Sequence, residues 1–277
     1  MNARQIMIRK IISGGQPGAD RAALNAAILM GISHGGWIPK GRITEDGTLP
    51  DKYELREMPT SSHPTPIEQN VIDSDGTLIF FRGKPTGGTE FTRKIALQHD
   101  KQLLLIDLNN PTSYDAASLI LSWISLQKIK VLNVAGPSAS KDSGICGEVL
   151  RILKMAITMG GIKKENHPLR CNTAKEDRPS KPPITVEEAV ERLIMGLSLR
   201  DKSTLVNMAE TELCTLNSNL GKYIRNEFDL WSGNIELLTS CCYFVKRDKI
   251  DQDEASSIII REAWKQLGKT HRLRIIK

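Results

Sequence analysis

The stretch Ser13-Gly14-Gly15-Gln16-Pro17-Gly18-Ala19-Asp20 decides the fold class of this chain. The segment before it, Lys10–Ser13, is short and β-branched, which predicts a strand. The segment after it, Asp20–Met30, is rich in alanine and stops before Gly31, which predicts a helix. A strand, a glycine-rich turn and a helix in this order are typical of a βα unit in a parallel sheet.

The same alternation continues along the first half of the chain. Further strands are predicted at Gly76–Phe81, Gln102–Leu108 and Lys130–Ala135, and further helices at Glu90–Gln98, Ala116–Gln127 and around Gly147–Met159. Repeated strand–helix units place helices on both faces of a parallel sheet. We therefore expect an α/β, Rossmann-like doubly wound fold with a mainly parallel sheet, followed by a smaller, mainly helical domain.

The domain organisation follows from a change of composition near residue 160. Residues 1–160 form the expected Rossmann-like ligand-binding domain, and residues 161–183 are basic and contain prolines, which is typical of a linker. Residues 184–277 have mainly helical patterning, including Glu254–Leu267. Thr185 and Glu188 have the spacing of a capping box, which predicts the start of the first helix of this helical accessory domain.

The composition of the 277 residues restricts the class of ligand. The net charge is +6, with 23 − 18 = +5 in residues 1–180 and 15 − 14 = +1 in the remainder. Only 5% of the residues are aromatic, so the stacking platforms of single-stranded nucleic-acid binders are scarce. A modest basic excess on the α/β part favours a small anionic ligand and makes nucleic acid an unfavoured partner.

No apolar run reaches the length of a membrane span, and no signal-peptide apolar region precedes Gly14. The five cysteines form no C-x-x-C pair, and no histidine lies at zinc-ligand spacing from one of them. These features predict a cytoplasmic protein with reduced thiols, without a membrane partner and without a metal site.

Three glycine loops at predicted strand–helix junctions carry the chemistry. The first loop is Ser13–Asp20, the second is Thr86–Glu90 and the third is Gly136–Ser140. In a parallel sheet they meet at the carboxyl edge, where free amides at helix N-termini bind phosphates and other oxyanions. None is a Walker loop or a G-x-G-x-x-G loop. The predicted ligand-binding residues of the loops are Ser13, Gly14, Gly15, Gly18, Ala19, Asp20, Thr86, Gly87, Gly88, Thr89, Gly136, Pro137, Ser138 and Ser140.

Three basic residues are candidates for neutralising the charge of the ligand. Lys40 and Arg42 flank Gly41, and Arg82 follows the predicted strand Gly76–Phe81. Each is placed to supply a cation to the loop edge, and each is equally consistent with a solvated basic surface.

Two acidic residues have open roles. Asp20 either orients the first loop or contacts a ribose, or it simply favours the positive end of the helix dipole. Glu90 begins a helix as well, so a capping role competes with a catalytic one.

The segments SGGQPGADRAAL, HGGWIPKGRITEDGTLPDKYEL, SDGTLIFFRG, TGGTEFT and NVAGPSAS occur in this order between Ser13 and Ser140. As a set they resemble the putative molybdenum carrier family, a Rossmann-like group in the superfamily of the Lonely Guy phosphoribohydrolases and lysine-decarboxylase-like proteins. The resemblance covers about residues 8–158. Pro17 and Ser138 depart from the family pattern, where Thr and Arg are expected. Residues 184–277 resemble a helical domain of unknown function.

Three alternative functions follow, the first two from the resemblance and the third from the two-domain organisation. The first is a binding or carrier protein that holds a phosphorylated nucleotide-like or pterin-like anion, with the molybdenum cofactor or a nucleotide as its cofactor. The second is a hydrolase of nucleotide N-glycosidic bonds, in which Glu90 corresponds to the catalytic glutamate of the Lonely Guy enzymes. The third is a nucleotide sensor that signals through the helical domain. The Lonely Guy relatives also imply a homodimer.

Overall fold

The computed structural model describes residues 8–59, 64–161 and 181–270. The described residues form two compact units, one from residues 8–111 and 116–161 and the other from residues 112–115 and 181–270. Most of the predicted linker, 161–183, lies outside the described residues. Because the two units are separate bodies, each is described by itself.

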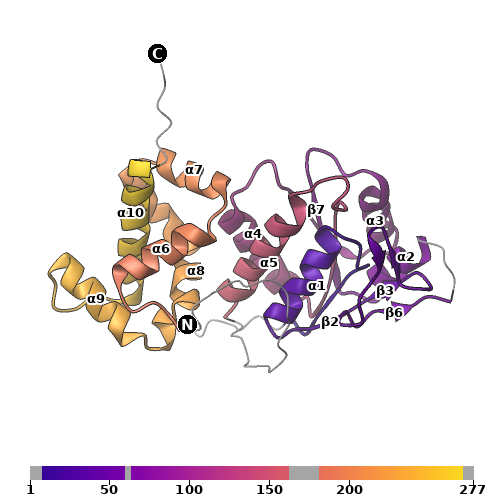
Figure 1. Cartoon of the computed structure of the whole chain (residues 1–277), viewed down its shortest axis with the longest axis horizontal. Helices are drawn as coiled ribbons and strands as arrows, with labels where there is room; N and C mark the ends of the chain where they lie inside the picture. The colour runs from indigo at the N-terminus through magenta and orange to yellow at the C-terminus, as the bar shows by residue number, and fades with distance from the viewer. Residues whose placement is uncertain (1–7, 60–63, 162–180, 271–277) are drawn as a thin grey trace, which may run out of the picture. The chain divides into compact units, whose positions relative to one another are not determined.

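The first unit is built on a five-stranded parallel sheet (Figure 1). Its strand order is β2-β1-β9-β7-β8, with β1 at Lys10–Ile12, β2 at Ser33–Gly35, β7 at Gly76–Phe81, β8 at Gln102–Asp107 and β9 at Val131–Ala135. The last of these five strands, β9, lies between β1 and β7 and pairs with both in parallel register. The expected Rossmann-like, mainly parallel fold is therefore confirmed.

Five helices cover this sheet (Figure 1). They are α1 (Ala19–Leu29), α2 (Pro64–Ile72), α3 (Gly87–Gln98), α4 (Ser113–Gln127) and α5 (Ile145–Met159). Helices α1, α4 and α5 lie on one side, and α2 packs with α3 on the other through Val71, Ile95 and Ala96. The predicted strands and helices agree with these bounds to within a few residues.

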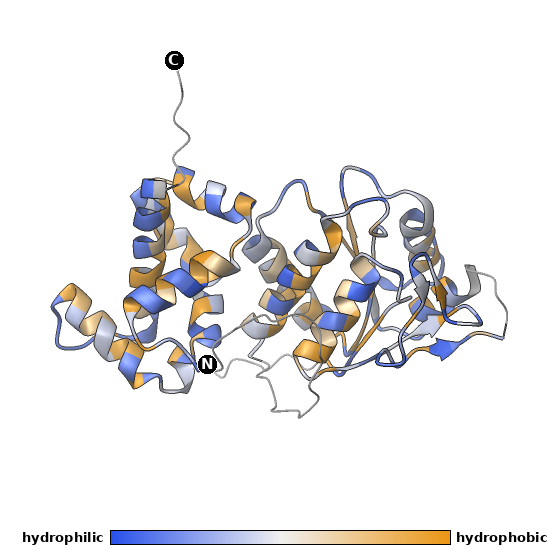
Figure 2. Ribbon diagram, in the orientation of Figure 1, coloured by the Kyte–Doolittle hydropathy of each residue, from blue (hydrophilic) through white to orange (hydrophobic). Residues whose placement is uncertain are grey.

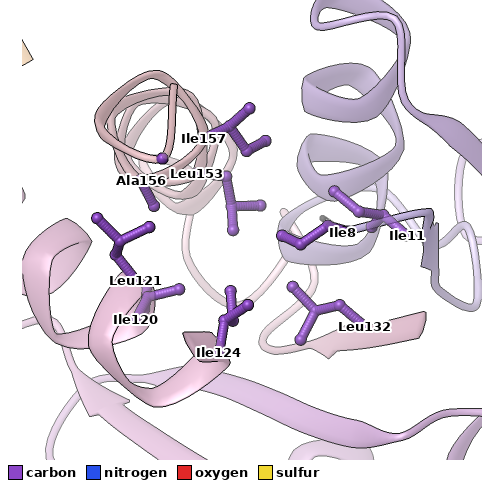
Figure 3. A pocket seen from close by; sticks show the side chains of 10 residues that line it. Ile8, Ile11, Ile120, Leu121, Ile124, Leu132, Leu153, Ala156 and Ile157 are labelled. Carbon is purple, nitrogen blue, oxygen red and sulfur yellow. The ribbon is translucent and has the colours of Figure 1, made fainter. Parts of the chain in front are cut away.

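The core between the sheet and its helices is aliphatic, as the low aromatic content predicts. Apolar residues gather where the helices face the strands, while polar residues lie outward (Figure 2). Figure 3 shows side chains of α4, α5, β1 and β9 converging on a cavity of about 10 Å³. A space of that size is at the limit for a single water molecule and has an apolar lining, so it is a packing gap in the core and not a ligand site.

An insertion between β2 and α2 was not predicted from the sequence. It contains β3 (Trp37–Ile38), β4 (Ile43–Thr44), β5 (Gly47–Thr48) and β6 (Arg56–Glu57), which form two small two-stranded sheets. Ile38, Leu49, Tyr53 and Leu55 pack the insertion against Leu24 of α1. The insertion is therefore held by an apolar cluster that it shares with α1, the helix that follows the first loop.

The second unit is helical, as expected. It contains α6 (Val186–Gly196), α7 (Leu199–Asn207), η1 (Glu210–Ser218), α8 (Leu220–Glu227), η2 (Leu230–Ser232), α9 (Ile235–Val245) and α10 (Gln252–Thr270). Helix α10 packs against α6, α7, α8, α9 and η1, which makes it the centre of the unit. None of the described helices is long and apolar enough to cross a bilayer.

The predicted capping box at Thr185 is half correct. Thr185 caps α6, because its hydroxyl accepts a hydrogen bond from the Glu188 backbone N–H at 3.2 Å. The Glu188 carboxylate, however, accepts from the N–H of Ile184 at 3.0 Å and not from that of Thr185. The reciprocal bond therefore reaches one residue further back than a capping box requires.

Candidate functional site: a cleft at the carboxyl edge of the sheet

A cleft of about 590 Å³ opens in the first unit where β1, β7 and β9 end. The first and third loops, the start of α3, the insertion and α2 all line it. This is the edge at which open α/β sheets bind their ligands, and the volume suits a small organic molecule. The ligand-binding residues predicted from the sequence that do line this cleft are Gly14, Asp20, Gly88, Thr89, Gly136, Pro137, Ser138 and Ser140.

The first and third loops are joined to each other by backbone hydrogen bonds. The Ala19 N–H donates to the Pro137 carbonyl at 3.1 Å, and the Ala139 N–H donates to the Pro17 carbonyl at 2.7 Å. Gly18 lies at this crossing with φ +119°, and a Cβ there would be 2.5 Å from the Pro137 oxygen. The Ala19 amide, predicted as an oxyanion donor, is thus occupied by the protein itself.

The Asp20 carboxylate lies directly over the first loop. A Cβ on Gly14 would be 2.8 Å from Asp20 Oδ2, so the missing side chain of Gly14 leaves the space that this carboxylate fills. Burial raises the pKa of Asp20 to about 7, although hydrogen bonds with the backbone of Gln16 and Gly14 and with the Ser13 side chain lower it. Asp20 is therefore a carboxyl group on the cleft that changes its charge near neutral pH.

The other first-loop residues have packing roles. Ser13 is fully buried, and its hydroxyl donates to the Val134 carbonyl at 2.6 Å, linking the ends of β1 and β9. Gly15 has φ +78°, and a Cβ there would meet the side chains of Leu49 and Leu55. These residues shape the loop without lining the cleft.

A glutamate from the insertion holds the third loop. Glu45, in the turn between β4 and β5, accepts hydrogen bonds from the Ser140 N–H at 3.2 Å and the Ser140 hydroxyl at 2.8 Å. Ser140 in turn lies 2.9 Å from the Ser138 hydroxyl. Hydrogen bonds from Ser140 and Ser138 outweigh the opposing effect of burial and hold the pKa of Glu45 below its usual range. Sequence reasoning missed Glu45, which is 95 residues away from its partner.

The second loop is arranged differently. Thr86 is the N-cap of α3, but its side chain makes no capping hydrogen bond, and Gly88 has open space where a Cβ would be. Among the described residues, no acceptor is found for the first amides of α3. The start of this helix lies on the cleft through Gly88 and Thr89, so its positive end faces the cavity.

Among the described residues that line the cleft, the basic side chain is that of Lys141, which sequence reasoning missed. A Cβ on Gly87 would be 2.8 Å from the Lys141 ammonium nitrogen, so this nitrogen lies beside the start of α3. Within the part of the chain that the structure describes, no carboxylate pairs with it. The sequence could have pointed to Lys141 through its position directly after Ser140, the last residue of the third loop.

The structure places the three predicted cations outside the cleft lining. Lys40 is exposed. Arg42 donates to the carbonyls of Leu49, Pro50, Tyr53 and Leu55 at 2.8–3.1 Å, which fixes the insertion. Arg82 donates to Asp142 at 2.7 Å and also pairs with Glu148.

Glu90, the predicted catalytic residue, does not line the cleft either. Its carboxylate forms a two-pronged ion pair with Arg93 one helical turn further on, at 2.7 and 2.8 Å. This pairing holds the pKa of Glu90 below its ordinary value. A carboxylate engaged in this way on the helix surface is a poor general base.

The remaining wall of the cleft is largely apolar and amide-bearing. Trp37, Pro39, Ile43, Pro66 and Ile67 line it together with Asn133 at its floor. Asn133 is buried and its amide donates to the Thr77 hydroxyl at 3.3 Å. Among the described residues no group of three or more His, Cys, Asp and Glu side chains could hold a metal ion.

The fold and this cleft define a class of protein, the Rossmann-like α/β proteins that hold a small ligand at the carboxyl edge of a parallel sheet. Within that class the chain belongs to the circularly permutated YpsA SLOG family, whose model matches residues 11–157. A domain of unknown function, DUF6794, matches residues 182–267.

One solved structure is similar to the first unit. It is the crystal structure of a protein described as a putative molybdenum carrier from Syntrophus aciditrophicus, with 50% sequence identity and a TM-score of 0.53. The match covers 54% of this chain and 94% of that one. No curated protein matches the chain. The predicted resemblance to this family is confirmed.

Proposed function

We propose that the first unit is a binding or carrier domain for a small organic anion, held in the cleft by the start of α3 and by Lys141. The observation that carries this proposal is the uncapped N-terminus of α3 on the cleft, with the Lys141 ammonium group beside Gly87. Aligned amides and one cation together bind phosphate or a comparable oxyanion strongly.

The ligand class follows from the cavity and from the similar protein. A volume of about 590 Å³ with Trp37 and proline walls has room for a flat organic body as well as an oxyanion. A phosphorylated nucleotide-like or pterin-like molecule fits both features, and the protein from Syntrophus aciditrophicus is described as a putative molybdenum carrier. The donors on the cleft suit the phosphate end of a pterin or nucleotide cofactor better than direct coordination of the metal.

Binding is favoured over N-glycosidic hydrolysis because Glu90 is engaged by Arg93 and does not line the cleft. A signalling role through the helical unit and a homodimer remain predictions, as does a cytoplasmic location.

Calorimetric titration with adenosine 5′-monophosphate (AMP) tests the proposal. Lys141→Gln should weaken AMP binding at least tenfold, and Gly88→Asp should abolish it by placing a carboxylate among the free amides. Gly88→Ala is the matched control, because the position is open, and should change affinity only slightly. Equal affinity of Gly88→Asp and wild type would refute this site, and release of adenine during the titration would favour the hydrolase.

The natural ligand is addressed by mass spectrometry and elemental molybdenum analysis of the protein as purified. A phosphorylated small molecule that is lost in Gly88→Asp would support the proposal.

A further inference from the structure

Two of the three glycine loops are already occupied by carboxylates of the chain. Asp20 fills the space above Gly14 and receives hydrogen bonds from the first-loop backbone. Glu45 receives the N–H and hydroxyl bonds of Ser140 in the third loop. The donors that would hold an oxyanion on these loops therefore hold the protein's own carboxyl groups.

The donors on the cleft that remain open belong to the start of α3 and to Lys141. The start of α3 has no side-chain cap, and the Lys141 ammonium group lies beside Gly87. The cleft thus has groups that attract an anion, at the start of α3 and at Lys141, and two carboxyl groups, Asp20 and Glu45, that repel a second anion. At these carboxyl groups a ligand gains energy only by donating hydrogen bonds.

We propose that Asp20 is a specificity-determining residue that accepts hydrogen bonds from hydroxyl or amino groups of the ligand and so selects phosphate monoesters with a donor-rich organic body over free oxyanions. This inference rests on the proposed function and extends it from anion binding to the class of anion. A bare tetrahedral oxyanion would gain only the interactions with the α3 amides and Lys141. A ligand with two separated anionic groups would place one of them against the carboxylates of Asp20 and Glu45.

The charges around Asp20 leave its carboxyl group able to take this role. Arg21, the neighbouring cation on α1, is directed to Asp46 at 2.5 Å and to the Gly15 carbonyl. The raised pKa of Asp20 makes the charge of this side of the cleft depend on pH around neutrality. Other charged or titratable groups on the surrounding elements are Glu45 and Asp46 on the β4–β5 turn, Cys146, Glu148, Arg151 and Lys154 on α5, and Lys141 after the third loop.

The test is a calorimetric comparison of AMP, adenosine and sulfate on the full chain at pH 8. Wild type should bind AMP at least tenfold more tightly than sulfate. Asp20→Asn removes the charge with almost no change of shape, so it should weaken AMP and adenosine, strengthen sulfate, and lower the AMP-to-sulfate preference about tenfold. Asp100→Asn, the same change at an exposed site outside the cleft, is the matched control and should leave the preference unchanged. An unchanged preference in a folded Asp20→Asn variant overturns the inference.

A second measurement covers the case in which Asp20→Asn fails to fold. Sulfate keeps its charge and adenosine stays neutral between pH 6 and pH 8, so changes in their binding to wild type report on the protein. Sulfate should bind several-fold more weakly at pH 8, where Asp20 is charged, than at pH 6. Affinities for sulfate and adenosine that are both constant across this range overturn the inference.

Failure of the proposed function looks different. In that case neither AMP nor sulfate binds wild type, or both bind equally well to Lys141→Gln.

Discussion

The second glycine loop and the pair formed by the first and third loops have similar sequences and opposite roles. The first and third loops are bonded to each other at Gly18 and Pro137 and are filled by Asp20 and Glu45. The second loop is open, uncapped and accompanied by Lys141. Glycine at a strand–helix junction therefore allows close approach of backbone to backbone in one case, and in the other it leaves open the amides at which we propose that the ligand binds.

The largest effect is expected when the junction of the closed loops is disrupted. Gly18→Ala should destabilise the first unit by about 4 kcal/mol, because a Cβ forced into a glycine-only conformation adds to the cost of overpacking. A Cβ there would lie 2.5 Å from the Pro137 oxygen and 2.7 Å from the Ala139 nitrogen. Hydrogen exchange of α1 and β9 peptides would report the loss for this unit alone.

The matched comparison is Gly88→Ala in the open loop. It should cost less than about 1 kcal/mol, because no atom lies within 4 Å of a Cβ at this position. Similar losses for the two variants would show that the closed and open loops do not differ as described.

This contrast also shows what the sequence could and could not predict. Gly76–Phe81 was predicted at its observed bounds because a continuous apolar run between turn residues identifies a buried strand. The small strands of the insertion are two residues long, too short to show any periodicity. The three loops were located correctly, but their partners were not, since Glu45 and Ser140 are 95 residues apart in the sequence and meet only in the folded structure.

A second prediction concerns Asp20 in the first loop and the pH dependence of the stability that its ionisation causes. The folded-state pKa of Asp20, about 7, lies above its ordinary value of 3.8, so the folded protein holds a proton that the unfolded chain releases. The stability contributed by this proton is fully present below about pH 4 and is lost as the pH rises to about 7. Asp20→Asn should therefore gain stability relative to wild type across that range, by a few kcal/mol in total.

Urea unfolding of both proteins at pH 5, 6, 7 and 8 would measure this difference. A gap that widens up to pH 7 and then stays constant is the expected result. A gap independent of pH would mean that Asp20 is ionised throughout and carries no unusual burial cost.

A third prediction compares the stability contributed by Arg42, which fixes the insertion, with that of Lys40, which is exposed. Arg42→Lys should cost about 2 kcal/mol, because an ammonium group cannot replace a guanidinium fork that reaches four carbonyls. Lys40→Gln, two residues away and exposed, should change stability by less than about 0.5 kcal/mol. Thermal unfolding of the two variants tests this, and a larger loss for Lys40→Gln would reverse the assignment.

The smallest effect on stability is expected at Glu45, the exposed carboxylate that holds the third loop. Glu45→Gln keeps one acceptor for Ser140 and removes an exposed charge, so the stability should change by less than about 1 kcal/mol.

Binding should respond more than stability to Glu45→Gln, because one of the two carboxylates that repel an oxyanion is then neutral. Sulfate affinity should rise about two- to threefold in Glu45→Gln, less than in Asp20→Asn, since Glu45 is the more exposed of the two and its charge is better screened. A calorimetric titration at low ionic strength would resolve this difference, and the rise should shrink as salt is added. A gain that persists at high salt would instead indicate that Glu45 blocks the third loop sterically and that its neutral form releases Ser140 to the ligand.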